Sequence, residues 1–509
     1  MLNNKFINRL VCLAIVGNSV SFASAQEKAH PFSGIDYKVE GQVTASSSHY
    51  SPTWLNANKY GLSSVKGDNG YIEVGAHRSV DNDSLRRWRV GYGVDLVGAY
   101  NFTSSFVIQQ LYADFRFKNK VGISIGSKQR PSEFKDNDLS TGSQTFGTNA
   151  RPVPNLRIEI PEYLSLTGKS DWVGIKGHIG YGMMTDQNWQ KDYVASGVRY
   201  VTGSFLHTKA GYMRFGNEQK FPLVFDGGLE MATQFGGTIH NLYNGTTGQY
   251  YDLKMKNGVK DFFSVLYGGG SDATDGKGYG NATGNTLGSW LLSLSYKFKN
   301  DTKLRVYYDH FFEDHSQVFW QYGWKDGLIG AEITFPENPV ISRFVYEYAY
   351  TKYQSGSVYH DHTPTISDQV SALDNYYNHG LYWGWQHWGQ AIGNPLFRSP
   401  LYNSNGVLTF TSNRFIAHHF GIKGSPCSCL NYRILYTYTS NWGTYEKPYS
   451  EVKFGNSFLV ELGWHPSRLG KLNTKGWEVK AAFAFDKGAQ THNNTGCQFT
   501  ITKTGLFTK

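Results

Sequence analysis

The sequence has little charge, few cysteines and no long apolar run. Charged residues make up 17% of the 509 residues, and only 4 residues are cysteine. A helix that crosses a bilayer needs about 20 consecutive apolar residues, and no stretch approaches that length. The mean hydropathy of −0.44 is also too low for a protein that spans a membrane with helices. These absences exclude a helical membrane protein.

Common catalytic motifs are also missing. The chain contains no nucleophile elbow, no phosphate-binding loop and no HExxH pattern. We therefore expect no enzymatic activity and no bound metal or other cofactor. Lys and Arg form no dense cluster, so we do not expect nucleic acid as a partner.

Aromatic residues and glycine are plentiful instead. Aromatics make up 16% of the chain, with 35 Tyr, and there are 57 Gly. A transmembrane β-barrel needs a wet lumen, an apolar outer face and Tyr and Trp at both membrane interfaces. The composition therefore favours an all-β outer-membrane barrel.

The N-terminus has the pattern of a cleaved signal peptide, residues 1–25. Lys5 and Arg9 precede a short apolar run, Leu10 to Val16, and Ala23-Ser24-Ala25 offers a cleavage site. We expect the mature chain to begin at Gln26, exported to the bacterial outer membrane. A lipoprotein anchored at Cys12 is disfavoured, because no small residue directly precedes that cysteine.

Apolar and polar residues alternate along many segments, as in strands with one lipid-facing and one lumen-facing side. Clear examples are residues 111–117, 292–298, 344–351, 433–438 and 477–486. Such segments are centred near residues 41, 74, 94, 111, 124, 160, 177, 208, 229, 263, 292, 307, 329, 346, 418, 434, 460, 481 and 499. Because bacterial barrels usually have an even strand number, we predict about 18 antiparallel strands.

No linker or internal repeat divides the chain, so residues 26–509 are predicted to form one barrel with a long insertion at about 354–411. The last segment, ending near Phe507, loosely fits the C-terminal strand that the barrel-insertion machinery recognises. The formal net charge of +9 fits a partner such as an anionic glycan or the phosphates of outer-membrane lipopolysaccharide, or simple solvation of the loops.

Part of the insertion, residues 374–403, is typical of a sugar-binding surface. Flat aromatic rings suit the apolar faces of sugars, while amide and guanidinium groups suit the hydroxyls. The alternative is that these aromatic side chains pack inside the barrel, and the two roles are compatible. The candidate residues are Tyr376, Tyr377, Trp383, Trp385, His387, Trp388, Asn394 and Arg398.

Arg151 and Arg157 are further candidates for contact with anionic sugars, because they lie near prolines in a less alternating stretch. The alternative is a structural salt bridge with Glu159 or Glu162. These two carboxylates could also pair as acid and base in glycoside hydrolysis. We disfavour hydrolysis because strand alternation would place them on opposite faces.

Cross-links are weakly predicted. Cys427, Cys429 and Cys497 remain after signal cleavage, and Cys429 and Cys497 lie near neighbouring predicted strands, so a disulfide is conceivable. The Cys-Ser-Cys spacing is a poor metal motif. A metal cluster of residues 360–362 with His379 or His387 is possible on residue type, but a polar surface loop is favoured.

Several long motifs resemble the capsule-assembly Wzi family, especially its members from Bacteroides-like bacteria. The resemblance extends over nearly all of the mature sequence. It rests on residues 52–64 (PTWLNANKYGLSS), 134–163, 177–186, 312–336, 374–403 and 413–424 (NRFIAHHFGIKG).

The resemblance implies a barrel of about 18 strands with small helical elements plugging its periplasmic side. It also implies a lectin-like, non-enzymatic role in holding capsular polysaccharide on the cell surface. It assigns no individual binding residues. Two alternatives remain: a porin or sugar-uptake channel, and an outer-membrane lipid hydrolase, for which the sequence offers no defined catalytic set beyond His418 and His419.

Overall fold

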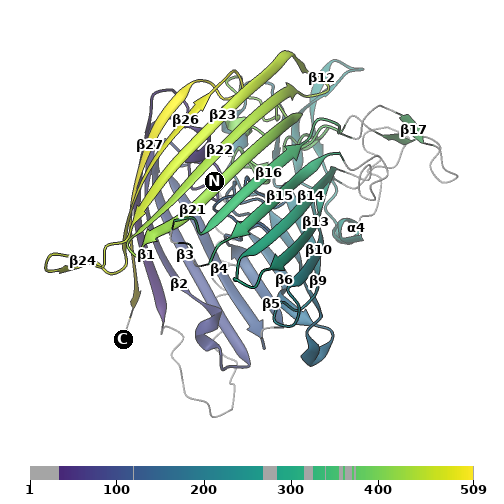
Figure 1. Cartoon of the computed structure of the whole chain (residues 1–509). Helices are drawn as coiled ribbons and strands as arrows, with labels where there is room; N and C mark the ends of the chain where they lie inside the picture. Colours follow the sequence, from purple (N-terminus) through teal and green to yellow (C-terminus); the bar gives the residue numbers. More distant parts are fainter. Residues whose placement is uncertain are drawn as a thin grey trace.

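Eighteen antiparallel strands form one closed barrel in the computed structural model (Figure 1). The structure describes residues 34–118, 120–267, 284–313, 325–336, 338, 340–354, 359–361, 369–371 and 374–507. The barrel strands are β1 (Ile35–Ser46), β2 (Asn69–Arg78), β3 (Trp88–Tyr100), β4 (Phe106–Phe117), β5 (Val121–Ser127), β6 (Asn155–Ser165), β7 (Val173–Met183), β9 (Phe205–Phe215), β10 (Leu223–Phe235), β13 (Asn285–Lys297), β14 (Lys303–Glu313), β15 (Gly327–Thr334), β16 (Arg343–Tyr350), β21 (Phe415–Cys427), β22 (Leu430–Gly443), β23 (Pro448–Trp464), β26 (Trp477–Lys487) and β27 (Asn494–Phe507).

The first and last strands close the barrel by pairing with each other, from Ile35 opposite Phe507 to Ser46 opposite Gly496. The predicted fold class and strand number are confirmed. The predicted signal peptide, residues 1–25, lies outside the described residues. In the described part of the chain, no helix is both long enough and apolar enough to cross a membrane.

The two faces of the wall differ as the alternation predicts. In β1, Val43 is 62% exposed on the outside, whereas its neighbour Gln42 is 5% exposed on the lumen side. The same contrast recurs in β2 between Ile72 and Glu73. Apolar side chains thus cover the outside and polar ones line the lumen, the reverse of a soluble protein and the arrangement that lipid requires.

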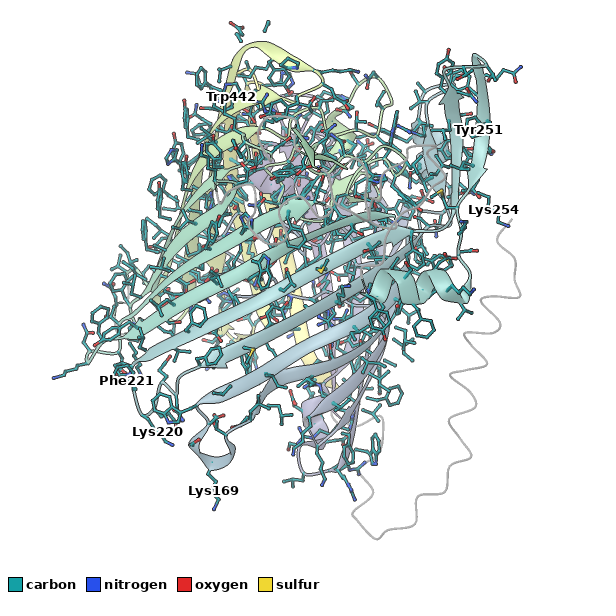
Figure 2. All side chains as sticks on the ribbon, turned by 90° about the vertical axis from the view of Figure 1, so that its right-hand side faces the viewer. Lys169, Lys220, Phe221, Tyr251, Lys254 and Trp442 are labelled. Atoms are coloured by element: carbon teal, nitrogen blue, oxygen red, sulfur yellow. The ribbon has the colours of Figure 1, made fainter. Side chains whose placement is uncertain are left out.

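Connections at the two ends of the barrel differ in length. One end, the turn end, has short connections such as 118–120 and 428–429, and both barrel termini, Ile35 and Phe507, lie there. The other end, the loop end, carries the long connections 236–284 and 351–414. Figure 2 shows Lys169, Lys220 and Phe221 at the turn end, and Trp442 and Tyr251 at the loop end.

Short helices and strands lie in the connections between the barrel strands (Figure 1). At the loop end, β8 (Tyr200–Thr202), β11 (Thr238–Asn244) and β12 (Gln249–Lys254) form one sheet, and β17 (Tyr359–Asp361) pairs with β18 (Gln369–Ser371). The remaining elements are α2 (Thr53–Asn56), η2 (Val80–Asp83), η3 (Gly168–Ser170), α3 (Trp189–Tyr193), α4 (Val259–Tyr267), β19 (Gln386–His387), β20 (Gln390–Ala391), η5 (Pro400–Tyr402), β24 (Arg468–Leu469) and β25 (Leu472–Asn473).

Helix α4 corrects one prediction. The segment centred near residue 263 was expected to be a strand, but it forms a helix between β10 and β13. The other predicted centres all fall within barrel strands.

Three loop-end connections fold into the lumen and fill it. These are residues 47–68, 128–154 and 374–414, called the plug below. Of the helical elements expected to plug the barrel, the plug contains the single turn α2 and the 3-10 turn η5; most of the rest is irregular. Its packing is tight at Gly393, where an added Cβ would lie 2.0 Å from the Tyr377 hydroxyl and 2.1 Å from the Gln144 carbonyl oxygen.

Buried polar contacts fix the plug to the wall. The Lys135 ammonium group lies 2.9 Å from the Asp309 carboxylate of β14, with both side chains 1% exposed. The Glu347 carboxylate of β16 accepts hydrogen bonds from both hydroxyls and one backbone N–H of Ser140 and Thr141, at 2.6–2.7 Å. Because an unpaired buried charge is costly, these contacts specify where the plug sits.

The plug also contacts other strands of the barrel wall. The Trp54 indole donates to the Thr437 hydroxyl of β22 at 3.1 Å, and the Gln109 amide of β4 donates to the Tyr60 carbonyl oxygen at 2.8 Å. Wall strands on several sides therefore hold the plug, and cavities remain on both sides of it.

Candidate functional site

A cavity of about 910 Å³ lies at the loop end, above the plug. Its walls come from the plug segment 374–411, from the ends of β13 and β14, and from residues 444–449, which form the β22–β23 connection and the start of β23. Elements far apart in the sequence thus converge on one hollow at the end of the barrel that carries the long connections.

Trp383 is the aromatic centre of this loop-end cavity. The Arg199 guanidinium lies over its ring, 4.5 Å from the centroid, and donates to the Gly380 carbonyl oxygen. Burial lowers the pKa of Arg199 to about 10, so the group stays charged at neutral pH. Among the described residues no carboxylate forms an ion pair with it. The pair offers a flat ring and an uncompensated cation.

Amide groups hold the neighbouring backbone in place and line the same cavity. Asn378 donates to Asn375 Oδ1 and to the Phe410 carbonyl oxygen, both at 2.9 Å, and Asn413 donates to Asn375 Oδ1 at 2.6 Å. The Nδ1 atom of His379 accepts the backbone N–H of Leu381 at 3.0 Å. This network makes the cavity wall rigid and polar.

Another part of the cavity wall supplies a second ring and further charges. Glu446 and Lys447 line the cavity from the β22–β23 connection, and Tyr449 lines it from the start of β23. The Lys453 ammonium group lies 4.1 Å from the centre of the Tyr449 ring. Rings on both walls, amides and charges of both signs together suit a ligand with many hydroxyl groups.

Most of the predicted site residues lie inside the plug rather than in the loop-end cavity. The Trp385 indole donates to the Thr145 carbonyl oxygen at 3.0 Å, and Asn394 donates to Thr141 Oγ1 at 3.0 Å. His387 lies 2.8 Å from the carbonyl oxygens of Arg151 and Thr185. The buried members of the set within residues 374–403 are Tyr376, Tyr377, Trp385, His387 and Asn394. Their contacts join the plug segments to one another.

The two adjacent tyrosines connect the plug to the end of β14 and to Asp326, which directly precedes β15. The Tyr377 ring stacks on Phe397 with centroids 3.9 Å apart, and its backbone N–H donates to Glu313. The Tyr376 hydroxyl donates to the Asp326 carboxylate at 2.8 Å. Burial raises the pKa of Asp326 to about 6.

Three predicted residues lie away from the loop-end cavity: Arg151 is buried, and Trp388 and Arg398 are half-buried. The Arg151 guanidinium lies 4.4 Å from the centre of the Trp388 ring, and it donates to Thr103 Oγ1 at 2.8 Å. Arg398 lies over the Tyr402 ring at 4.5 Å and donates to the Gln490 carbonyl oxygen. Of the predicted set, only Trp383 therefore lines the loop-end cavity.

The turn-end side of the plug contains a different kind of cavity. A hollow of about 420 Å³ is lined by Arg151, Arg157, Lys176 and several other charged residues. Arg157 Nε lies 2.7 Å from Glu159, the structural ion pair considered as an alternative. Two further cavities on this side, of about 500 and 610 Å³, are also lined by charged groups of both signs.

The expectation that Glu159 and Glu162 face opposite sides was wrong. Both line the 420 Å³ cavity. The pairing of β6 with β7 is irregular around Pro161, because the four steps from Ile160 to Leu164 lie opposite only two steps from Gly177 to Ile175, and this irregularity interrupts the alternation of the strand. The Arg157 contact holds Glu159, so the two carboxylates do not form an isolated pair.

The predicted cross-links have mixed outcomes. Cys429 and Cys497 are not joined; instead, the Sγ atoms of Cys427 and Cys429 lie 2.9 Å apart, and all three thiols are free. No group of metal-ligating side chains occurs within the described ranges. His362 and the side chains of His360 and Asp361 lie outside them.

Sequence reasoning missed most of the loop-end cavity. Arg199, Asn378 and Tyr449 all line it, and none of them was singled out. Asn378 lies inside the aromatic segment 374–403 that was identified, so that segment carried the available signal. Arg199 and Tyr449 come from distant connections and carry no local pattern.

No protein-family model matches the chain, and no curated protein matches it. Among solved structures it is similar to Wzi of Escherichia coli, an outer-membrane carbohydrate-binding β-barrel involved in group 1 capsule assembly. The identity is 12% and the TM-score is 0.52, over 92% of this chain and 83% of that one.

Lower TM-scores relate the chain to OccK3 and OprD of Pseudomonas aeruginosa. For OccK3 the TM-score is 0.45 at 10% identity, over 93% of this chain and 96% of that one. For OprD the TM-score is 0.46 at 10% identity, over 96% of this chain and 100% of that one. The Wzi likeness concerns the fold, and it agrees with the closed wall and apolar outer face described above. The chain has the fold of an outer-membrane β-barrel.

Proposed function

We propose that this chain binds capsular or related surface polysaccharide at the outer face of the bacterial outer membrane. Its apolar outer face suits a bilayer, and outer-membrane barrels carry short turns on the periplasmic side and long loops outside. The loop end would then face the exterior, with the loop-end cavity open to surface glycans.

The observation that carries the proposal is the combination of Trp383 and Arg199 in that cavity. A tryptophan ring suits the apolar face of a sugar, and a charged guanidinium suits a hydroxyl or a uronic acid carboxylate. The amides of Asn375 and Asn378 add donors and acceptors on the same wall. The E. coli Wzi barrel, which shares the fold, is a carbohydrate-binding protein.

The plug favours binding over transport. Buried ion pairs and hydrogen bonds attach it to strands around the lumen, so a solute would have to displace it. A porin or sugar-uptake channel is the second candidate, and it predicts steady conductance of the purified protein in planar bilayers. The proposed binding protein would give no steady conductance.

The decisive experiment is deletion of the gene in its host, with surface polysaccharide measured on the cells and in the medium. We expect normal total polysaccharide with a shift from the cells to the medium. Unchanged attachment would contradict the proposal, and the channel would then become the leading candidate.

Complementation with single variants tests the site itself. Trp383→Ala should weaken binding of the host polysaccharide by roughly tenfold, because loss of an aromatic anchor commonly costs more than 1 kcal/mol. Trp172→Ala is the matched control, since Trp172 is exposed in a turn-end connection. Equal effects of the two variants would exclude the loop-end cavity as the site.

A further inference from the structure

Helix α4 lies against the outer face of the barrel wall, where lipid is expected (Figures 1 and 2). The Phe262 ring packs 5.4 Å from Phe205 and 5.0 Å from Phe235, at the loop-end ends of β9 and β10. The Tyr181 hydroxyl of β7 donates to the Phe262 carbonyl oxygen at 2.7 Å. The helix is therefore docked on three strands.

The docked side of α4 covers polar groups on the wall. The Lys209 ammonium group of β9 donates to the carbonyl oxygens of Val265 and Leu266, at 3.3 and 2.6 Å. These carbonyls belong to the last turn of the helix, where a cation is favourable. His207 beside it is fully buried. The helix thus removes a cation and an imidazole from contact with lipid.

The opposite side of α4 is also apolar. Val259, Phe263 and Tyr267 are 74%, 56% and 81% exposed, and their spacing of four residues places them on one face of the helix. A helix that faced only water would carry polar residues there. This face instead continues the apolar surface of the barrel at its loop end.

Three lysines lie beside this apolar face. Lys254, Lys256 and Lys260 are exposed, and none forms an ion pair in the part of the chain that the structure describes. The nearby carboxylates are engaged elsewhere, Asp252 with His240 at 2.7 Å and Asp261 with the Gly258 N–H at 2.7 Å. Figure 2 shows Lys254 on the same side of the molecule as α4, nearer the tip of the loop end.

We propose that α4 and these three lysines form a binding site for a phosphorylated glycolipid of the outer leaflet. The acyl chains would contact Val259, Phe263 and Tyr267, and the phosphates would contact the lysines. An amphipathic helix with lysines at its polar border is the usual element for such a boundary. The site rests on the outward orientation of the loop end and is independent of polysaccharide binding.

The test uses the full chain purified in detergent and native mass spectrometry, with diphosphoryl lipid A as the probe. We expect the K254E/K256E/K260E variant to retain at least fivefold less lipid A than the unsubstituted chain. The matched control is K169E/K220E/K471E, which reverses three exposed lysines at the turn end and should change retention less than twofold. Equal losses in the two triple variants would overturn the proposal.

Two further measurements separate the parts of the site. Dephosphorylated lipid A should bind several-fold more weakly than the diphosphoryl form, and equal binding would refute the role of the lysines. Phe263→Asp should weaken retention of both forms, whereas retention at the unsubstituted level would refute the apolar contact. Heat-dependent gel migration of each variant shows whether the barrel has formed.

Discussion

The two sides of the plug have opposite chemistry within one lumen. On the loop-end side, Arg199 is paired with a tryptophan ring. On the turn-end side, Arg157 is paired with Glu159 at 2.7 Å and Lys176 with Glu133 at 2.6 Å. Arg151 also lines that side, but the Trp388 ring over which it lies does not. Cations and carboxylates that pair satisfy one another, whereas Arg199 has no carboxylate partner among the described residues and shares its cavity with the Trp383 ring. This difference is the basis for proposing the loop-end side as the glycan site.

The largest expected effect comes from breaking the ion pair that attaches the plug, which separates the two sides of the lumen, to β14. Asp309→Ala would leave the Lys135 ammonium group buried without its partner, and such a loss commonly costs about 3–5 kcal/mol. We expect a large drop in denaturant stability and the appearance of conductance in planar bilayers. The double variant K135M/D309L should be less damaging; a single variant as stable as the unsubstituted chain would contradict the anchoring role.

A smaller effect is expected from pH. Asp326 keeps its proton up to about pH 6 in the folded chain, but only to about 3.9 when unfolded. Between these values the folded state binds more protons, so its stability should rise as pH falls from 6 to 4, by up to roughly 3 kcal/mol. Asp326→Asn should remove this dependence.

Unfolding midpoints at pH 7.5 and pH 4.5 check this prediction. The difference between the two pH values should be larger for the unsubstituted chain than for Asp326→Asn. If the unsubstituted chain and Asp326→Asn show the same difference between the two pH values, the Asp326 carboxylate does not contribute to the pH dependence of stability.

The smallest expected effect tests directly whether polysaccharide binds on the loop-end or the turn-end side of the plug. Arg157→Gln alters the turn-end side, so polysaccharide affinity should change less than twofold, far less than the tenfold expected for Trp383→Ala. Affinity is measured for both variants with the same host polysaccharide. A comparable loss in Arg157→Gln would place the glycan below the plug and reverse the assignment.

The barrel could be predicted from the sequence because a single physical rule applies to every strand. Lipid outside and water inside demand a period of two, as in Val43 beside Gln42. Helix α4 escaped this rule because Phe263, Val265 and Tyr267 occupy alternate positions, while Val259, Phe263 and Tyr267 also recur every four residues. Short apolar segments with both periods are ambiguous.

The site could be predicted only as a region. Residues 374–403 were correctly recognised as rich in aromatics and amides, but their division between plug and cavity depends on distant partners. Trp385 is buried because its indole finds the Thr145 carbonyl oxygen, 240 positions away in the sequence. Trp383 meets Arg199 from another connection. No local pattern contains these pairings.

The attachment of the first plug segment has a consequence for the order of assembly. The N–H and hydroxyl of Thr53 both donate to the Asp486 carboxylate at 2.9 Å, across 433 positions of sequence. Asp486 lies in β26, the penultimate strand of the chain. The Thr53 end of this segment can therefore attach only after almost the whole chain has been delivered, although Tyr60 can already accept its hydrogen bond from Gln109 of β4. The last step of plug docking and the closure of the barrel then both come late, and a chain that stops before β26 should complete neither.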